Sequence, residues 1–372
     1  MDVIEVDPEL VRRYVAEQIR HPHGFHAEIS PEDEMLLHAL AGYRGNVSRA
    51  FTQYMLQGKQ MVDQVRQFAD WAFGGWNEVG AFLDFASGHG RFTRHLIQEL
   101  PAERVVISDL YEDAVRFQKK HFGVHGVLSA VNPGDLEIDR GDFDLIFVSS
   151  LFSHLPYRTF QPWLEKLVSL LSARGVLVFT TRKTGSADSE FEFNPLSESR
   201  SLEPSVYGTT FVSESFVRKC FIEVSKGKLG WRRIENGHLN FQDVYVVTRN
   251  PRAEFRALDY QRGFSGHVGA CWMNPEGTIG MRGWAADFDS VARPIRIEVY
   301  ANGNLVREFT PDHDRPDIAK LHASPIARWS GWNCHFDRDE LHRDDWISIQ
   351  IVNDRDQRHV ISLSPLHEMV EW

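Results

Sequence analysis

The chain has 372 residues, of which 42% are hydrophobic and 25% charged, a composition typical of a globular protein with more than one domain. Its formal net charge of −11 disfavours non-specific binding to nucleic acid or to an anionic membrane. Its three cysteines lie far apart, which disfavours a disulfide framework or a structural zinc site and fits a reducing compartment.

The first segment, residues 1–78, has a broken helical pattern and is expected to form a helical cap. Ser30 can cap a helix whose first turn contains Pro31, and a longer amphipathic helix is expected over 46–73. The acidic N-terminus lacks a secretory signal, and no window is apolar enough to span a membrane. We therefore expect a cytoplasmic protein with no integral membrane segment and no nucleic-acid partner.

Residues 79–250 alternate short apolar strands with helices, which predicts an α/β domain with a parallel sheet covered on both faces. A long polar excursion over 183–207 follows the fifth strand, and a final hairpin adds an antiparallel last strand. The expected strands are 81–85, 105–109, 126–131, 143–149, 175–181, 230–234 and 243–248. The expected helices are 92–100, 112–122, 160–172 and 213–220.

Beyond a linker at 251–263, residues 264–372 read as an all-β domain, and the spacing of its short strands predicts a sandwich. The domain carries six of the ten tryptophans, which favours core filling over the alternative that they stack on sugar faces. This domain is also the expected site of any homo-oligomer contact. The six are Trp272, Trp284, Trp329, Trp332, Trp346 and Trp372.

The first strand of the α/β domain ends in an acid and runs into the Gly-containing loop Asp84–Gly90, with a helix after it. Gly88 and Gly90 allow tight turning, and the helix N-terminus offers free N–H groups to a ligand. The second strand ends at Asp109, 19 residues after Gly90, where a carboxylate can bind ribose hydroxyls. The layout indicates a nucleotide site, with an ordinary tight turn as the alternative.

Two residues indicate whether this loop binds a methyl donor or a dinucleotide. A dinucleotide fingerprint starting at Gly88 requires Gly or Ala in its sixth position, where this chain has Thr93. The acid at Asp84 suits the ammonium group of a methyl donor better than it suits phosphates. The loop therefore favours S-adenosylmethionine over a nicotinamide cofactor.

The stretch Phe82–Arg91 resembles motif I of the class I (Rossmann-like) S-adenosylmethionine-dependent methyltransferases, with Ala86 in place of a glycine. Residues 143–156 and 175–180 resemble the fourth and fifth strands of that family. The resemblance implies a Rossmann-like fold, methyltransferase activity and S-adenosylmethionine as the cofactor. It implies that the cofactor is bound by Asp84, Ala86, Ser87, Gly88, Gly90, Asp109, Leu110 and Ser149.

The adenine contact is expected just after the third strand, where Asn132 and Asp135 are candidates and a solvated turn is the alternative. Three further stretches resemble a bacterial branch associated with glycans and the cell surface. They are 54–58, 150–155 and 207–213. In that branch Tyr54 and Gly58 cover the methionine end of the cofactor, and a helix packing face is the alternative. Residues 283–287 and 315–317 resemble β-modules found beside bacterial glycosyltransferases.

Methyl transfer to a hydroxyl needs in-line alignment and removal of the acceptor proton, a task that suits histidine near neutral pH. His154 follows the fourth strand and is the expected base, with an orienting or helix-start role as the alternative. His89 is expected to shape the cofactor loop. Arg91 can meet the cofactor carboxylate, a substrate acid or solvent. We assign no metal, because the triplet 312–314 fits a solvated loop.

Three functions follow, in order of preference. The first is an O-methyltransferase whose acceptor is a sugar or is linked to a glycan. The second keeps the cofactor and replaces the acceptor with a small metabolite or an amine. The third is a glycan-binding or scaffold protein on an inactive methyltransferase fold, which the intact Gly88, Gly90 and Asp109 disfavour.

Overall fold

The structure is a computed structural model that falls into two compact units. One unit joins Met1–Gln60 with Gln261–Trp372, and the other comprises Met61–Tyr260. The first unit therefore combines both ends of the chain, whereas the sequence patterns divide the chain into four consecutive segments. The structure describes residues 3–21, 24–185, 188–196, 199, 202–289 and 295–370.

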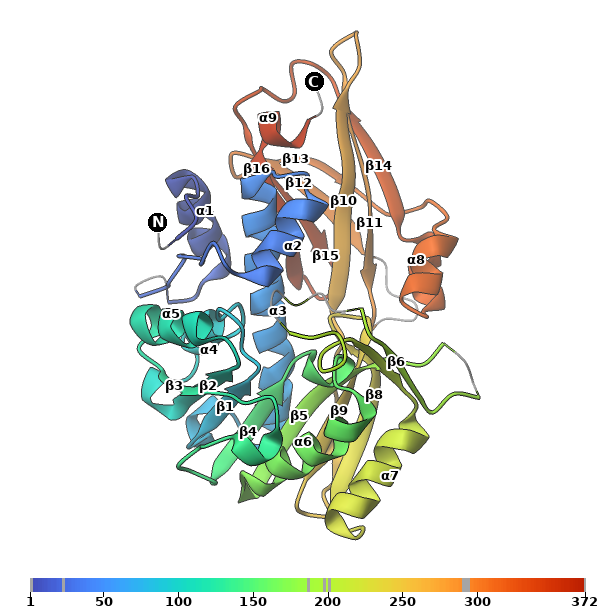
Figure 1. The fold of residues 1–372 in the computed structure, drawn as a ribbon. Coiled ribbons are helices and arrows are strands. Elements are labelled where there is room, and N and C mark those ends of the chain that lie inside the picture. Colours follow the sequence, from blue (N-terminus) through green and yellow to red (C-terminus); the bar gives the residue numbers. More distant parts are fainter. Residues whose placement is uncertain are drawn as a thin grey trace. The chain divides into compact units, whose positions relative to one another are not determined.

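The second unit is built on a mostly parallel, Rossmann-like sheet with the strand order β3-β2-β1-β4-β5 (Figure 1). Beyond β5 the sheet continues with β9, which is antiparallel to β5, and then with β8, which is antiparallel to β9. The antiparallel β9 is the last strand of this domain in the sequence, as predicted. The strands are β1 (Phe82–Phe85), β2 (Val105–Asp109), β3 (His125–Leu128), β4 (Phe143–Val148), β5 (Leu171–Lys183), β8 (Gly230–His238) and β9 (Gln242–Thr248).

The described residues between β5 and residue 213 contain two strands that the sequence patterns did not predict. Strand β7 (Thr209–Val212) pairs in parallel with the end of β5, and β6 (Phe191–Asn194) pairs antiparallel with β7. Every residue of β1, β2 and β4 is buried, as expected for strands covered on both faces.

The helices of the second unit follow the predicted alternation with changed ends. Helix α4 is shorter than its predicted range because the amides of Gln98 and Glu99 bond to carbonyls three residues back, which tightens the turn before Pro101. The helices are α4 (Thr93–Leu96), α5 (Glu112–Phe122), α6 (Tyr157–Ser169) and α7 (Glu214–Ser225). Short 3-10 turns are η1 (Trp76–Glu78), η2 (Ala102–Arg104), η3 (Pro133–Asp135), η4 (Leu151–Ser153) and η5 (Phe255–Ala257).

The N-terminal part of the first unit consists of α1 (Pro8–Gln18), α2 (Glu34–Gly42) and the start of α3 (Val47–Phe73), which ends in the second unit. The predicted cap at Ser30 is wrong. Asp33 caps α2 by accepting hydrogen bonds from the backbone amides of the second and third helical residues at 2.9 and 3.2 Å. A turn that begins at Ser30 precedes this helix.

The C-terminal part of the first unit contains two separate antiparallel sheets, in the orders β10-β11-β14 and β13-β12-β15-β16. Both sheets contribute to one hydrophobic core, which includes Met281 and Trp332 from the first sheet and Ile297 and Ile349 from the second. The strands are β10 (Phe264–Met273), β11 (Ile279–Asp287), β12 (Arg296–Ala301), β13 (Asn304–Phe309), β14 (Gly331–Phe336), β15 (Trp346–Val352) and β16 (Arg358–Pro365). The short helices are α8 (Pro316–Leu321), the 3-10 helix η6 (Pro325–Trp329) and α9 (Leu366–Met369).

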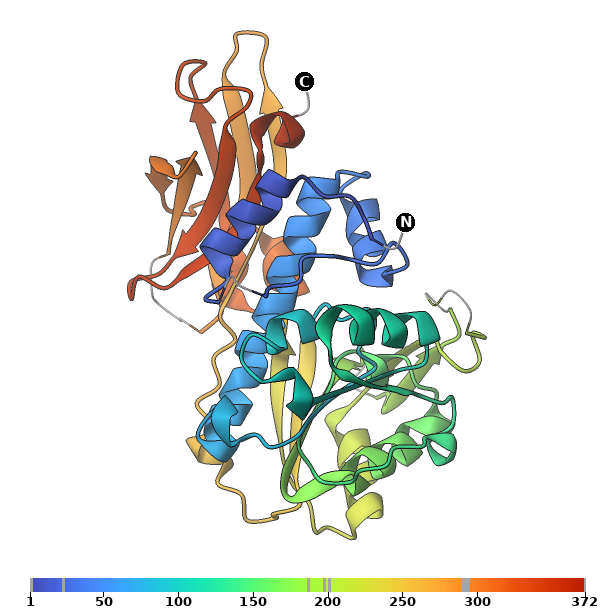
Figure 2. The ribbon, with the colours of Figure 1, turned by 90° about the vertical axis from the view of Figure 1, so that its left-hand side faces the viewer.

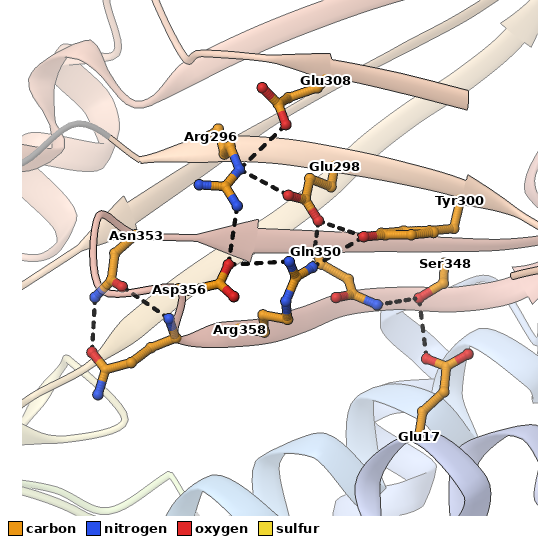
Figure 3. Close-up of polar contacts among 11 residues, drawn as sticks. Glu17, Arg296, Glu298, Tyr300, Glu308, Ser348, Gln350, Asn353, Asp356 and Arg358 are labelled. Carbon is orange, nitrogen blue, oxygen red and sulfur yellow. Dashed lines mark hydrogen bonds and ion pairs between the residues drawn. The ribbon is translucent and has the colours of Figure 1, made fainter. Parts of the chain in front are cut away.

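Helix α1 packs against the four-stranded sheet, beside its red C-terminal strands in Figure 2. Its Glu17 lies 3.2 Å from the Ser348 hydroxyl, and polar contacts continue along the same face (Figure 3). There the buried Glu298 carboxylate accepts hydrogen bonds from Arg296, Tyr300 and Arg358. In the described ranges, no helix combines the length and apolar character needed to cross a membrane.

Candidate active site

The loop after β1 lies where the strand order of the sheet reverses, because β2 pairs with one side of β1 and β4 with the other. Strands added on either side of such a point leave a crevice outside their carboxyl ends. The topology therefore places residues 86–92 at the position where ligands bind in open α/β sheets.

The two glycines of this loop serve different purposes. Gly90 has a φ of +84°, and a Cβ on it would lie 2.4 Å from the Phe122 ring and 2.8 Å from Gln118 Oε1. Gly88 has a φ of +55°, and nothing lies within 4 Å of the place where its Cβ would be. Gly90 thus allows close packing against α5, whereas Gly88 keeps the loop surface open. Ala86 adopts a left-handed φ of +59° without being a glycine.

Two buried side chains that the sequence analysis missed hold this loop. Gln118 on α5 donates from Nε2 to Ser87 Oγ and to the Gly88 carbonyl, each at 2.8 Å. Arg94 on α4 donates from Nε to the Gly90 carbonyl at 3.2 Å and packs over the Phe122 ring. Both are completely buried. The signal that could have identified them in the sequence is a polar residue at a helix position that the apolar pattern assigns to the buried face.

Asp84 is buried at the end of β1 and accepts a hydrogen bond from Thr93 Oγ1 at 2.7 Å. Burial raises the pKa of Asp84 to about 7; the Thr93 hydrogen bond opposes that rise and the nearby Asp109 charge adds to it. Thr93, which distinguishes this loop from a dinucleotide fingerprint, therefore also orients the acid. A cation bound nearby would favour the ionised form of Asp84.

Asp109, at the end of β2, is hydrogen-bonded to the other side of the loop. Its Oδ2 accepts from the Gly88 amide at 2.7 Å, and its Oδ1 accepts from the Tyr111 amide at 3.0 Å. Each carboxylate oxygen has a second lone pair, so these bonds orient the group and leave it able to accept from hydroxyls. Leu110 follows and is half-buried.

The other residues predicted to bind the cofactor lie in different environments. Asn132 is exposed at the start of η3 and donates from Nδ2 to Asp135 Oδ2 at 3.2 Å. Tyr54 is buried in the first unit, where its hydroxyl donates to Asp33 Oδ2 at 2.6 Å. Gly58 lies within α3. The roles assigned to Asn132, Tyr54 and Gly58 stay predictions.

Ser149 follows β4, and its Oγ lies 3.0 Å from Nε2 of His238 at the end of β8. Burial and the Arg91 charge lower the pKa of His238 to about 3, so its imidazole is neutral. The sequence analysis did not connect these residues, because they are far apart in the chain. His89 is a buried residue of the loop itself, with its Nε2 3.4 Å from Asp113 Oδ2.

His154 is buried and held in one orientation. Its Nδ1 lies 2.7 Å from the Gly208 carbonyl oxygen, and its ring stacks on Tyr207 at a centroid distance of 4.5 Å. A carbonyl only accepts, so Nδ1 carries the proton and Nε2 carries the lone pair of the neutral ring. This geometry is compatible with a base and with an orienting residue.

The triplet Asp312–Asp314 lies in the first unit. His313 Nδ1 bonds to the Asp312 carboxylate, and Asp314 pairs with Arg328 at 3.0 Å. Across the residues that the structure describes, no group of three or more His, Cys, Asp or Glu side chains is arranged to hold a metal ion.

Residues 83–177 match the family model described as a methyltransferase domain. The chain therefore carries a methyltransferase domain over this stretch. The match covers the β1 loop, Asp109 and β4, where most of the predicted cofactor residues lie. No curated protein matches the chain.

The methyltransferase domain is similar to solved structures at low identity. The DhpI–SAH complex shares 18% identity over 62% of this chain and 99% of that chain, with a TM-score of 0.40. DesVI of Streptomyces venezuelae shares 15% over 53% and 95%, with a TM-score of 0.40. The glycopeptide N-methyltransferase MtfA, complexed with sinefungin, shares 14% over 50% and 93%, with a TM-score of 0.36.

The geometry of the loop fits S-adenosylmethionine, the cofactor that the sequence predicts. The open position at Gly88 leaves room for a ligand against the backbone, where a side chain would intrude. Asp84 is the predicted partner of the cofactor's ammonium group, and Asp109 is the predicted acceptor for its ribose hydroxyls.

Proposed function

We propose that the domain methylates a hydroxyl of a sugar or of a glycan-linked acceptor. The observation that carries the hydroxyl assignment is the fixed imidazole of His154, whose Nδ1 is bonded to Gly208 at 2.7 Å. A hydroxyl must lose its proton during transfer, and an oriented neutral histidine is the ordinary group for that step. The glycan assignment is supported by the sequence resemblance of residues 54–58, 150–155 and 207–213.

In this proposal the cofactor lies along the β1 loop and supplies an electrophilic methyl carbon on a sulfonium. Gly88 lets the backbone approach it, Gly90 holds the loop against α5, and Asp109 accepts from its ribose hydroxyls. Asp84 balances the ammonium group, while Ala86, Ser87 and Ser149 line the strand ends. Leu110 and Asn132 are assigned to the adenine side.

His154 acts on the acceptor. Its Nε2 takes the proton of the attacking hydroxyl, and the Gly208 carbonyl steadies the Nδ1–H as the ring becomes charged. Stacking on Tyr207 prevents the ring from rotating. The alignment of acceptor and donor is the main contribution of the fold to the rate.

A second candidate is methylation of a small metabolite or amine, and the burial of His154 favours it. A side chain that is 8% exposed and bonded through its ring fits an orienting role. A neutral amine attacks through its own lone pair and loses its proton afterwards, so it needs no base at the moment of transfer.

Calorimetry with S-adenosylhomocysteine tests the cofactor assignments. Asp109→Ala should weaken binding by a factor of about 10 or more, since it removes charge-assisted hydrogen bonds. Asp142→Ala is the matched control, because Asp142 is exposed and pairs only locally with Arg140 at 2.7 Å. Equal affinities of Asp109→Ala and the control would remove the ribose assignment.

A methyl-acceptor screen over nucleotide sugars, lipid-linked glycans and amines then separates the two candidates. For a hydroxyl acceptor, His154→Ala should lower kcat by a factor of about 100 or more while the affinity for S-adenosylhomocysteine is retained. Methylation of amines alone, with normal turnover in His154→Ala, would overturn the hydroxyl proposal in favour of the second candidate.

A further inference from the structure

Residues 235–241, here called the β8–β9 arch, connect two antiparallel strands through strained backbone. The ladder between β8 and β9 loses its regular register between Ile234 and His238. Three residues of the arch have left-handed φ values, namely Asn236 at +49°, Leu239 at +50° and Asn240 at +64°. Left-handed backbone in residues other than glycine persists where surrounding contacts fix it, so the arch is held in place by its contacts.

The arch reaches a strand that is not its neighbour. Strand β8 is three positions from β4, through β9 and β5, which corresponds to roughly 14 Å at ordinary strand spacing. The side chain of His238 nevertheless lies 3.0 Å from Ser149, directly after β4. The arch therefore bends across the edge of the sheet at which the parallel strands end.

Several further hydrogen bonds anchor the arch. The Leu239 amide donates to Gln64 Oε1 of α3 at 3.3 Å, and Tyr260 donates its hydroxyl to the Gly237 carbonyl at 2.7 Å. Beneath the arch, Gln242 Oε1 accepts from Thr180, whose hydroxyl accepts in turn from the Ser150 amide. The Ser150 amide, the Thr180 hydroxyl and the Gln242 amide oxygen are thus bonded to one another.

Ser149 stands at the border between this closed part of the edge and the cofactor loop. In the parallel ladder Asp84 is opposite Phe147, so Ser149 comes level with Ala86 at the start of the loop. On its other side, the Arg91 charge acts on His238. The hydroxyl of Ser149 is therefore fixed from the arch at the place where the loop begins.

We propose that His238 is a positioning residue of the cofactor site, which acts by holding the Ser149 hydroxyl toward the loop. The inference rests on the proposed role of Ser149 in cofactor binding. Its physical basis is the cofactor's charge: a neutral imidazole can fix a hydroxyl beside a sulfonium and an ammonium, whereas an imidazolium would repel both. Burial beneath the arch keeps the ring neutral.

Calorimetry with S-adenosylhomocysteine on single and double variants of the full chain tests this role. His238→Phe and Ser149→Ala should each raise the Kd about three- to tenfold, the effect of one lost hydrogen bond. The double variant should bind as weakly as either single variant, because both remove the same interaction. His238→Gln, which can place an amide near the Nε2 position, should bind within about twofold of the unchanged protein.

Tyr260→Phe is the matched control, because it removes a different anchor of the same arch. It should lower the melting temperature and leave the Kd within about twofold. If Tyr260→Phe weakens binding as much as His238→Phe, or if the two single effects multiply in the double variant, the positioning role is wrong. If Ser149→Ala binds normally, the cofactor role of Ser149 fails and the inference fails with it. A normal Kd in His238→Phe beside a raised Kd in Ser149→Ala overturns the inference alone.

Discussion

Single residues of the β1 loop combine packing and ligand binding, and the two glycines allow these to be separated. Gly90→Ala places a Cβ 2.4 Å from the Phe122 ring, so we expect it to lower the free energy of unfolding. Overpacking together with left-handed strain corresponds to about 2–4 kcal/mol. Gly88→Ala meets no neighbour and should cost only the backbone strain of about 1 kcal/mol, yet weaken S-adenosylhomocysteine binding strongly.

Urea denaturation gives the first quantity and calorimetry the second. The expected pattern is a crossed one, in which Gly90→Ala affects stability more and Gly88→Ala affects affinity more. If both variants lost affinity and stability in the same proportion, the division of roles between these glycines would be wrong.

The acid at the end of β1 predicts a pH dependence. Burial raises the pKa of Asp84 to about 7 in the folded protein, above the ordinary value of an unfolded Asp. The folded state then binds more protons, so the contribution of Asp84 is most favourable below about pH 4 and is lost as the pH rises toward 7. At pH 8 we expect Asp84→Asn to be more stable than the unchanged protein by on the order of 1 kcal/mol or more.

The measurement is urea denaturation of both proteins between pH 5 and 8. The stability difference should shrink toward the lower pH, where Asp84 is protonated. Asp142→Asn serves as a control, because Asp142 is exposed. A difference independent of pH would mean that Asp84 is ionised throughout the range. Asp84→Asn should also weaken cofactor binding at pH 8, since it removes the charge opposite the ammonium group.

At the scale of elements, strands of the parallel sheet could be predicted because burial on both faces makes them continuous apolar runs. The β1 loop could be found because its glycines and acids are close in sequence. Gln118 and His238 could not, since α5 and the β8–β9 arch bring them to the site from distant parts of the chain. Strand β6 was missed because its exposed and half-buried residues alternate within a polar stretch.

The ion pairs on the polar face of the four-stranded sheet predict that stability also depends on the ionisation of Glu298. Glu298 is 3% exposed; burial alone would raise its pKa, but hydrogen bonds from Tyr300, Arg296 and Arg358 hold it below the ordinary value. Its stabilising contribution is therefore present above the unfolded pKa and is lost as the pH falls through the lower, folded pKa. Glu298→Gln should lower the free energy of unfolding by about 1–3 kcal/mol near neutral pH, the lower part of the range for a buried ion pair, because both arginines are partly exposed.

Glu308→Gln provides the comparison on the neighbouring strand. Glu308 is 52% exposed and lies 3.3 Å from the same Arg296, so its loss should change stability by less than about 0.5 kcal/mol. Thermal unfolding at pH 7 and pH 4 measures both variants. Equal effects of the two substitutions would show that burial of Glu298 adds nothing to the network.

At the scale of the whole molecule, the first unit joins the two ends of the chain. Side chains of α1 and α2 share one hydrophobic cluster with Val360 and Leu363 of β16, more than 300 positions further along the sequence. Local patterns identified the helices and the strands but could not reveal this packing, because an apolar face does not specify what covers it. The β-domain predicted over 264–372 therefore shares a hydrophobic cluster with α1 and α2.

This packing makes a long-range prediction about Leu10. The side chain is completely buried in α1, so Leu10→Ala should lower the free energy of unfolding of the first unit by about 2–5 kcal/mol. Because α1 contacts β16, hydrogen exchange should become faster in Arg358–Pro365 although the substitution is near the N-terminus. Leu37→Ala on α2 is the matched control, since Leu37 is 43% exposed, and it should leave exchange in β16 unchanged. If Leu10→Ala speeds exchange only within α1, the helix covers the sheet without stabilising it, and the C-terminal sheets are stable on their own.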